Sequence, residues 1–260
     1  MCAVSEVMKL PGQLGPMFDL SGKVALITGG AVGMGKASGL ALADAGATVI
    51  LADDADRVAQ LGDLPKGVEA IVLDVASEQA INEAVEAVAA RHGGIDILVN
   101  GAVVNHNKSL LEISADEWDH VQAINLKGAF LVIKAVVPHM RQRGGGRIVN
   151  ITTMGGAHPV LNGNGAYSAS RAGLNQLTRN VALDFAADGI TANAVLPGAI
   201  LTETINADFR PSGPGADPAR HIGGFGTPQD VTGLVLLLVS PAGRFISGQL
   251  IAVDGGFLVS

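Results

Sequence analysis

Short apolar segments alternate with longer amphipathic segments along most of the chain. Seven runs rich in Val, Ile, Leu and Ala have the length of buried strands, and each stops near glycine or a polar residue. These predicted strands cover residues 23–28, 48–52, 68–73, 95–99, 147–151, 190–195 and 249–253. Because such runs are apolar on both faces, we expect a parallel sheet that is covered on both sides.

Apolar residues at helical spacing fill the intervals between these strands, as in the stripe of Ile81, Val85 and Val88. The predicted helices are a segment from the glycines after the first strand to about residue 45, then 78–91, 115–141, a segment containing Tyr167 that runs to about 187, and 228–238. Strands and helices alternate without a repeat or a linker. The pattern therefore predicts one doubly wound α/β domain.

The chain of 260 residues divides into three predicted parts. Residues 1–20, which contain prolines and glycines, are expected to be a loose extension, and residues 21–260 are expected to form the domain. Within the domain, prolines, glycines and charges at about 199–224 predict a mobile lid over a site.

Composition narrows the possible functions. Hydrophobic residues make up 48% of the chain but aromatic residues only 3%, so the core is expected to be aliphatic. The formal net charge of −7 and the lack of a basic stripe disfavour nucleic acid as a partner. The six histidines show no pair at i+3 or i+4, so we expect no metal site.

Targeting and redox signals favour a cytoplasmic protein. No apolar run approaches the length of about 18 residues that spans a bilayer, and we expect no membrane partner. The N-terminus lacks the basic start and apolar block of a signal peptide. The single cysteine, Cys2, excludes an internal disulfide and fits a reducing compartment.

A glycine-rich turn joins the first predicted strand to the first helix. Gly29, Gly33 and Gly35 let a pyrophosphate approach the backbone closely, and the first-turn N–H groups point at it. Asp53 ends the next strand, 18 residues after Gly35. Its carboxylate can accept hydrogen bonds from both ribose hydroxyls of adenosine and would repel a 2′-phosphate, which favours NAD over NADP. The alternatives are that these glycines serve only a tight turn and that Asp53 and Asp54 only open the next one.

Tyr167 is the only tyrosine in the chain, and Arg171 follows it by one helical turn. A free phenol ionises near pH 10, and a neighbouring cation favours its ionised form, so this pair is a candidate acid–base. The alternative is a structural aromatic beside a solvated arginine. Asn125 lies among apolar neighbours and must find hydrogen-bond partners, either as a structural bridge or in a polar network.

From about residue 20 to its end, the chain resembles the short-chain dehydrogenase/reductase family. The motifs that carry the resemblance occur in the order typical of the family. They are the turn at 28–35, Asp53, Asp74-Val75, Asn100-Gly101-Ala102, Asn125, Thr153, Tyr167 with Arg171, Pro197-Gly198 and residues 253–256.

The resemblance implies a seven-stranded Rossmann fold, an NAD cofactor and a hydride transfer between the nicotinamide and a secondary alcohol or ketone. It implies that Tyr167 is the general acid–base, that Thr153 takes the place of the family's serine, that Asn125 holds a proton-relay water and that Arg171 takes the place of the family's lysine. The implied cofactor-binding residues are Gly29, Gly33, Met34, Gly35, Asp53, Asp74, Val75, Asn100, Ala102, Tyr167, Arg171, Pro197, Ile200 and Thr202. It also implies a homotetramer or homodimer that acts on a small molecule.

Two alternatives keep this fold. Halohydrin dehalogenases resemble the family but use an arginine where Arg171 stands, so Thr153, Tyr167 and Arg171 could form an epoxide without hydride transfer. Against this, Gly33 and Gly35 remain where those enzymes have bulky residues. The other alternative is a relative that binds NAD but turns over weakly or not at all, because Arg171 replaces the lysine.

Overall fold

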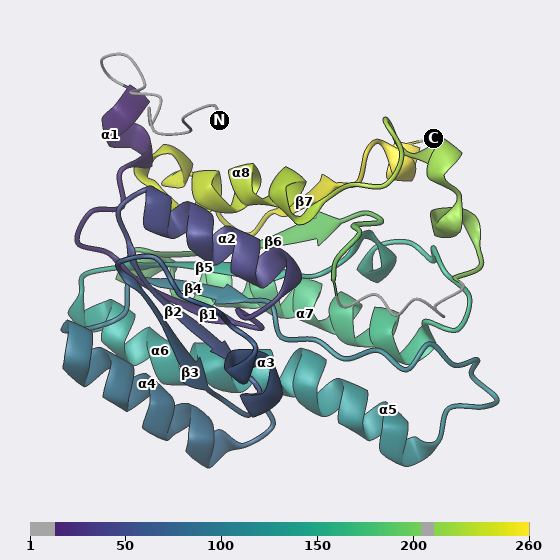
Figure 1. Cartoon of the computed structure of the whole chain (residues 1–260), viewed down its shortest axis with the longest axis horizontal. Coiled ribbons are helices and arrows are strands. Elements are labelled where there is room, and N and C mark those ends of the chain that lie inside the picture. The colour runs from purple at the N-terminus through teal and green to yellow at the C-terminus, as the bar shows by residue number, and fades with distance from the viewer. Residues whose placement is uncertain (1–13, 204–210, 260) are drawn as a thin grey trace.

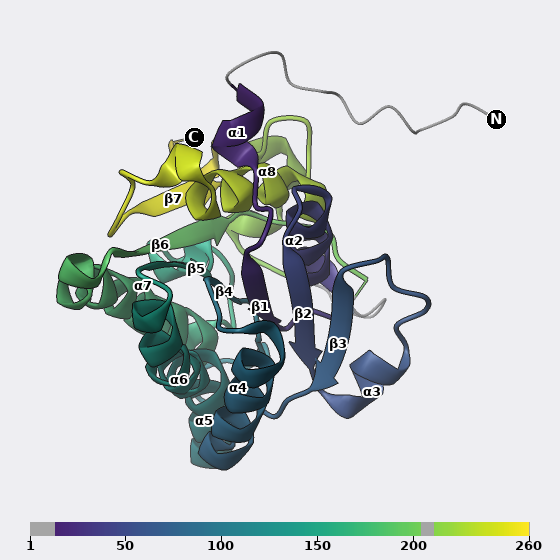
Figure 2. The same cartoon turned by 90° about the vertical axis from the view of Figure 1, so that its left-hand side faces the viewer.

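The computed structural model describes residues 14–203 and 211–259. Its seven strands form one parallel sheet in the order β3-β2-β1-β4-β5-β6-β7, which confirms the doubly wound Rossmann-type fold (Figure 2). The strands are β1 (Val24–Thr28), β2 (Thr48–Asp53), β3 (Val68–Val72), β4 (Ile97–Asn100), β5 (Gly146–Ile151), β6 (Ile190–Pro197) and β7 (Leu250–Val253). The strand order reverses between β1 and β4, and in open parallel sheets ligands bind at such a point.

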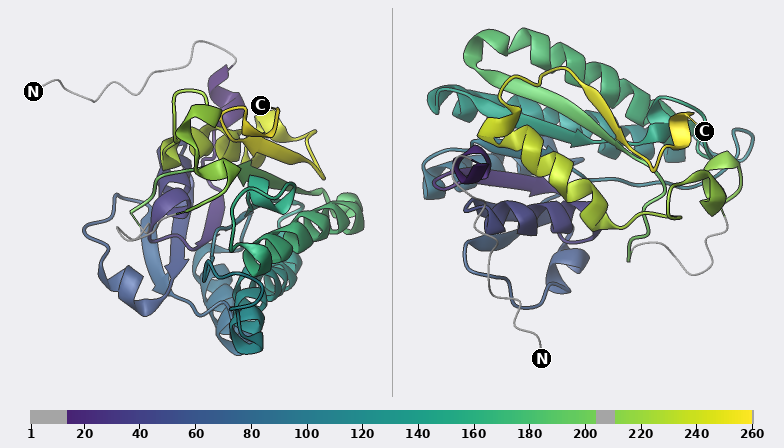
Figure 3. Two further views of the ribbon diagram at one scale, coloured as in Figure 1. Left: turned by 90° about the vertical axis from the view of Figure 1, so that its right-hand side faces the viewer. Right: turned by 90° about the horizontal axis from the view of Figure 1, so that it is seen from above.

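Helices cover both faces of the sheet (Figures 1 and 3). On one face lie α2 (Gly33–Asp44) and α8 (Pro228–Val239). On the other lie α4 (Glu78–His92), α5 (Ala115–Gln122), α6 (Ala129–Gln142) and α7 (Gly165–Asp184). The remaining elements are α1 (Leu14–Phe18), α3 (Ala55–Ala59), the π-helical turn η1 (Ala123–Gly128) and the 3-10 turns η2 (Met154–Gly156), η3 (Ala186–Asp188), η4 (Pro214–Ala216), η5 (Pro218–Arg220), η6 (Pro241–Gly243) and η7 (Phe257–Val259).

All seven predicted strands are present, with ends shifted by at most two residues. The predicted helix at 115–141 is interrupted by η1, and α3 was not predicted. Residues 14–18 of the expected loose extension are helical, while residues 1–13 lie outside the described residues. Of the expected lid, residues 211–224 contain η4 and η5, and residues 204–210 are not described.

Alternate residues of the central strands enter two separate aliphatic cores. In β1, Leu26 packs with the core under α4 and α6, whereas Ala25 and Ile27 pack with the core under α2 and α8. All three are fully buried. The sheet is therefore clamped between two helical layers, which leaves its carboxyl-terminal edge for a site.

A chain of buried polar side chains crosses the middle of the sheet. Thr28 donates to Asn100 at 3.4 Å, Asn100 donates to Asn150 at 2.9 Å, and Asn150 donates to Thr178 of α7 at 2.8 Å. The first three are register partners on β1, β4 and β5. Because buried polar groups must be paired, this series of hydrogen bonds fixes both the register of the central strands and the position of α7 on the sheet.

The helical run 115–142 is long and apolar enough to cross a membrane by length and composition, with a mean hydropathy of 1.4, although no such segment was expected. Half of this apolar window is buried in the domain. Its second part, α6, packs on α4, β4 and β5. This packing is that of a core helix, and the run carries no argument for a membrane.

Asp96, which precedes β4, ties three segments together at the amino-terminal edge of the sheet. Its side chain is almost fully buried and accepts hydrogen bonds from the Val24 backbone at 3.0 Å, from Lys23 at 3.1 Å and from Arg143 at 3.0 Å. Burial raises the pKa of Asp96, but the bonds from Arg143, Val24 and Lys23 outweigh it and hold the pKa below its ordinary value of 3.8.

Because the pKa of Asp96 is depressed in the folded state, its contribution to stability is full above its unfolded pKa and is lost as the pH falls through the folded pKa. We expect Asp96→Asn to lower the free energy of unfolding at pH 7 by about 2 kcal/mol. The difference from the parent should shrink as the pH falls from about 5 to 3. Urea unfolding at several pH values measures this, with Asp63→Asn on an exposed loop as the control. A difference that does not change with pH would contradict the ionic role.

Candidate active site

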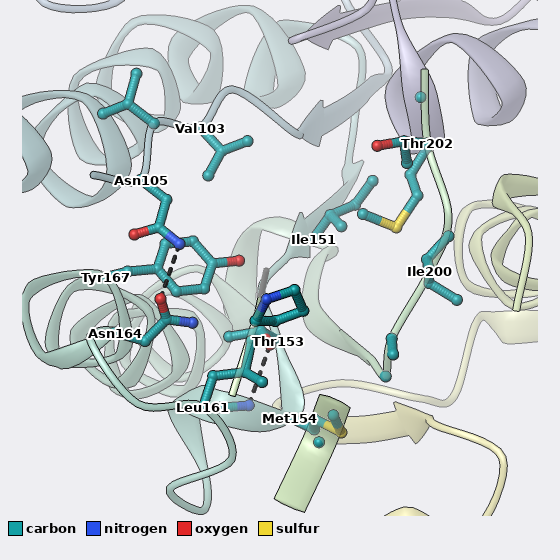
Figure 4. A pocket seen from close by; sticks show the side chains of 18 of the residues that line it. Val103, Asn105, Ile151, Thr153, Met154, Leu161, Asn164, Tyr167, Ile200 and Thr202 are labelled. Carbon is teal, nitrogen blue, oxygen red and sulfur yellow. Dashed lines mark hydrogen bonds between the residues drawn. The ribbon is translucent and has the colours of Figure 1, made fainter. Parts of the chain in front are cut away.

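A cavity of about 770 Å³ opens where the loops after β1, β4, β5 and β6 converge. These loops contribute Gly29, Val103, Thr153 and Ile200 to its wall (Figure 4). Convergence follows from the parallel sheet, because all its strands point their carboxyl ends to the same edge. The residues expected to hold the cofactor and those expected to do chemistry therefore share one cavity.

The glycine turn has no room for a side chain at Gly29 or Gly35. Gly29 and Gly33 have φ values of +64° and +53°, in the left-handed region that favours glycine. A Cβ on Gly35 would lie 2.1 Å from the Gly29 carbonyl oxygen, and one on Gly29 would lie 2.6 Å from the Ala102 nitrogen. All three glycines and Met34, which the resemblance assigns to cofactor binding, line the cavity. Their positive φ values and close contacts would also suit glycines that serve only a tight turn. The turn nevertheless opens onto the cavity, where a ligand could reach its backbone.

The N-terminus of α2 already holds an anion. Its N-cap residue, Val32, provides no side-chain hydrogen bond. Instead, the Gly33 N–H donates to the Glu203 carboxylate at 2.9 Å, across 170 residues of sequence. The hydrogen bond from Gly33 is the largest cause of the lowered pKa of Glu203. A helix N-terminus that binds a carboxylate fits a phosphate group equally well.

Asp53 is almost fully buried and bonds the backbone of the glycine turn. One of its carboxylate oxygens accepts from the Ala31 N–H at 3.0 Å, and the other accepts from the Asp54 N–H at 2.9 Å and pairs with Arg57 at 3.3 Å. Asp54 caps α3 by accepting from the Arg57 N–H, so that part of the turn-opening alternative is correct. Arg57 lines the cavity and was missed, because α3 has no apolar stripe that would predict it.

Tyr167 and Thr153 face the same space from two elements (Figure 4). Tyr167 lies in the first turn of α7, and Thr153 lies two residues after the end of β5. The Thr153 hydroxyl oxygen accepts from the Gly155 N–H at 3.1 Å and thereby begins η2. This bond fixes the hydroxyl oxygen and leaves its proton to donate to a bound oxygen.

Arg171 lies behind Tyr167, with 2% of its surface exposed. Its guanidinium donates to the backbone oxygen of Asn125 at 3.3 Å and to that of Ala102 at 3.1 Å, and its central carbon lies 5.7 Å from the centre of the Tyr167 ring. Burial lowers the pKa of Arg171, and the Tyr167 phenol opposes this shift. The charge is therefore next to the phenol, which rules out the solvated arginine of the structural alternative.

Arg171 is not one of the residues that line the cavity in the described part of the chain. Its guanidinium is held instead by the backbone oxygens of Asn125 and Ala102. The ribose contact implied by the resemblance thus stays a prediction, and the observed geometry favours the electrostatic part of its role.

Asn125 is fully buried in η1 and bridges to the loop after β4. Its side chain accepts from the Val104 N–H at 2.9 Å, donates to the Val104 oxygen at 2.9 Å and donates to the Ser170 hydroxyl at 3.1 Å. Asn125 is therefore both a structural bridge, through Val104, and part of a polar network, through Ser170. The water-holding role implied for Asn125 remains a prediction.

The other predicted cofactor residues divide between the cavity wall and its support. Ile200 and Thr202 line the cavity, while Pro197 ends β6 and pairs with Val253 of β7. Asn100 and Ala102 support the glycine turn from the neighbouring strand, Asn100 through Thr28.

Asp74 and Val75, which the resemblance assigns to the cofactor site, follow the end of β3. Asp74 is exposed and accepts from the Ala76 N–H at 2.8 Å, which closes its own turn. The Val75 backbone packs on Gly128 at the start of α6. Within the described chain, neither of them lines the cavity, so their contact with a cofactor stays a prediction.

Comparison with known proteins finds relatives over nearly the whole chain. The family model described as enoyl-(acyl carrier protein) reductase matches residues 29–258. The chain is 38% identical to a 3-oxoacyl-[acyl-carrier-protein] reductase of Thermotoga maritima, with 92% of this chain and 99% of the relative covered. It is also 38% identical to a 7alpha-hydroxysteroid dehydrogenase of Clostridium sardiniense, with 93% and 95% covered. A D-threitol dehydrogenase of Mycolicibacterium smegmatis is 35% identical, with 93% and 95% covered.

Solved structures show the same architecture. A dehydrogenase/reductase from Sinorhizobium meliloti 1021 superimposes with a TM-score of 0.83 at 34% identity, covering 94% of this chain and 98% of that one. A short-chain type dehydrogenase/reductase from Mycobacterium marinum gives 0.82 at 33% identity, with the same coverage. Together with the matched family model and the geometry of Tyr167 and the glycine turn, these likenesses show that the chain belongs to the short-chain dehydrogenase/reductase family of oxidoreductases.

Proposed function

We propose that the protein is an NAD-dependent oxidoreductase that transfers a hydride between nicotinamide and a secondary alcohol or ketone, with Tyr167 as the general acid–base. The observation that carries this proposal is the meeting of the glycine turn with Thr153 and Tyr167 in one cavity. The names of its relatives, which include reductases and dehydrogenases, support the same reaction class.

The side chains of the cavity suit proton handling at one oxygen atom. Thr153 donates to the substrate oxygen and holds it beside the Tyr167 phenol, which gives its proton during reduction and takes it back during oxidation. The buried charge of Arg171 stabilises the negative charge that develops on the phenol oxygen. A nicotinamide, when bound, supplies or accepts the hydride.

The preference for NAD rests on Asp53. Its buried carboxylate, fixed by Ala31 and Asp54, opposes the 2′-phosphate of NADP. Arg57 pairs with Asp53 and lines the cavity, so it offsets part of this repulsion. We therefore propose NAD as the preferred cofactor, with NADP as a weaker one.

Of the two alternative functions, the structure disfavours the dehalogenase and leaves the NAD-binding relative as a candidate. The dehalogenase would need a halide pocket in place of the cofactor turn, and that turn retains its glycines and opens onto the cavity. The second candidate function is a protein that binds NAD without turning over a substrate. It is retained because Arg171, which takes the place of the family's lysine, is held by the carbonyls of Ala102 and Asn125 and lies outside the cavity wall.

We also propose that the protein is a cytoplasmic homotetramer or homodimer. Its exposed large apolar side chains, such as Phe130, Leu183 and Phe245 on or beside α6, α7 and α8, support association through helix faces. The single cysteine supports a reducing compartment.

The main test compares the parent with Tyr167→Phe in absorbance assays of NAD⁺ and NADH with secondary alcohols and ketones. We expect the variant to lose at least about 100-fold in kcat, because the acid–base is gone. The rise in melting temperature that NAD⁺ causes should remain. Arg171→Lys serves as the comparison: binding without turnover in the parent, unchanged by this substitution, would favour the second candidate. No stabilisation of the parent by millimolar NAD⁺ would contradict the proposal.

Cofactor choice is tested at the end of β2. We expect Asp53→Asn to weaken NAD⁺ binding and to strengthen NADP⁺ binding, because it removes a charge that accepts from ribose and repels phosphate. Arg57→Gln should weaken NADP⁺ binding by about tenfold, because it removes a cation that can pair with the 2′-phosphate. Isothermal titration of both cofactors measures the ratio of dissociation constants, with Arg91→Gln on the exposed end of α4 as the control. A ratio that neither substitution changes would contradict the assignment.

The Gly33 N–H cannot donate fully to both Glu203 and a pyrophosphate oxygen, so a bound dinucleotide must displace this carboxylate. We expect Glu203→Gln to bind ADP about three- to tenfold more tightly than the parent does, because it removes a competing anion. Adenosine, which has no phosphate, should bind both proteins equally. Calorimetry measures these affinities, and Glu112→Gln, on an exposed turn after β4, is the charge-matched control. Equal gains for ADP and adenosine would contradict the competition.

A further inference from the structure

Two asparagines contribute to the cavity wall beside Tyr167, and the reaction described above uses neither of them. Asn105 lies in the loop after β4, and Asn164 is the N-cap residue of α7. The side-chain nitrogen of Asn105 donates to the side-chain oxygen of Asn164 at 2.9 Å, which Figure 4 shows as a dashed line.

The orientation of both amides follows from one backbone group. The side-chain oxygen of Asn105 accepts from the Asn107 N–H at 3.0 Å, and only an oxygen can accept there. The nitrogen of Asn105 therefore faces Asn164, which must present its own oxygen to this donor. Asn105 is in this way a positioning residue that fixes how the amide of Asn164 is turned.

The amide nitrogen of Asn164 consequently faces the cavity. Figure 4 shows it on the side of Thr153, below the Tyr167 ring. Among the residues that the structure describes, no acceptor bonds this nitrogen, although Asn164 as a whole is only 6% exposed. An unpaired donor in a nearly buried position favours a ligand that brings an acceptor.

The surroundings indicate that this acceptor is uncharged. The titratable side chains around this end of the cavity are Tyr167, His106 and His120, whereas Arg57 lies at the other end, beside the glycine turn. The described lining of this end includes neither a carboxylate nor a guanidinium, because Arg171 lies buried behind Tyr167, where two backbone carbonyls hold it. A hydroxyl or carbonyl oxygen fits such a donor without the cation that a carboxylate would require.

We propose that Asn164 is a specificity-determining residue that donates from its amide nitrogen to a second, neutral oxygen of the substrate. Asn164 lies three residues before Tyr167, so this oxygen is a few bonds from the reacting carbon. The substrate class is then the hydroxyketones and the corresponding diols, in preference to simple ketones and alcohols. This inference rests on the proposed dehydrogenase function and specifies its substrate.

The test uses 3-hydroxy-2-butanone and 2-butanone, which differ by one hydroxyl group next to the carbonyl. Asn164→Asp keeps the size of the side chain and an oxygen for Asn105 but removes the donor. We expect it to lower kcat/KM for the hydroxyketone by about 10- to 100-fold, mainly through KM, and that for 2-butanone by less than about threefold. Because both substrates meet the same added charge, their ratio cancels its effect on Tyr167.

Two further variants separate this role from a structural one. Asn105→Leu should reduce the preference for the hydroxyketone by a smaller factor than Asn164→Asp does. Without the bond from Asn105, the Asn164 amide can rotate and exchange the positions of its oxygen and nitrogen. Asn162→Leu, in the exposed loop before α7 where its amide bonds Ser212, should leave the ratio unchanged. An equal loss on both substrates in Asn164→Asp would overturn the inference, as would a parent that does not distinguish them.

Failure of the proposed function is recognised separately. If the parent reduces neither ketone, saturation-transfer NMR with NAD⁺ present compares their binding instead. The inference then requires that the parent binds the hydroxyketone at least about tenfold more tightly than 2-butanone and that Asn164→Asp abolishes this difference. Equal binding of the two, or no binding of either, would overturn it.

Discussion

The geometry of the active site depends on one buried cation. Placing a guanidinium in the protein interior is costly, and Arg171 offsets part of this cost through the carbonyls of Ala102 and Asn125, while its buried Nε has no hydrogen-bond partner within the described chain. Those carbonyls belong to the loop after β4 and to the π-helical turn η1, while Arg171 itself lies on α7. Three segments that are distant in sequence are thus joined at one point beneath Tyr167. A lysine carries a compact ammonium rather than a planar fork, and it would not span the two carbonyls in the same way.

The two ends of the cavity handle charge in opposite ways. At the glycine turn, the N-terminus of α2 attracts a carboxylate from Glu203, and Asp53 and Arg57 form an ion pair beside it. Around Thr153 and Tyr167, the described wall consists of amides, hydroxyls, imidazoles and aliphatic groups. An anionic group is therefore stabilised at one end, and a neutral oxygen is selected at the other.

The strands could be predicted because each is a short, mostly aliphatic run, and their alternation with helices indicates the doubly wound fold. The glycine turn and the pair of Tyr167 and Arg171 were also evident, since their spacing is local. The turn η1 escaped prediction because the apolar spacing of 115–141 continues through it. Glu203 escaped because its partner is 170 residues away. The direction of the Asn164 amide depends on Asn105 and Asn107, so only the three-dimensional arrangement reveals it.

The buried chain from Thr28 through Asn100 and Asn150 to Thr178 has a consequence for how the protein folds. If β4 slipped by one residue, the Asn100 amide would move to the opposite face of the sheet and enter an aliphatic core without partners. The last link of the chain is on α7, so the correct pairing of the central strands gains its full advantage only when that helix docks. Such distant contacts form late and slowly. Since α7 also carries Tyr167, a molecule that has paired its strands incorrectly would also lack this part of the cavity wall, and with it the proposed acid–base.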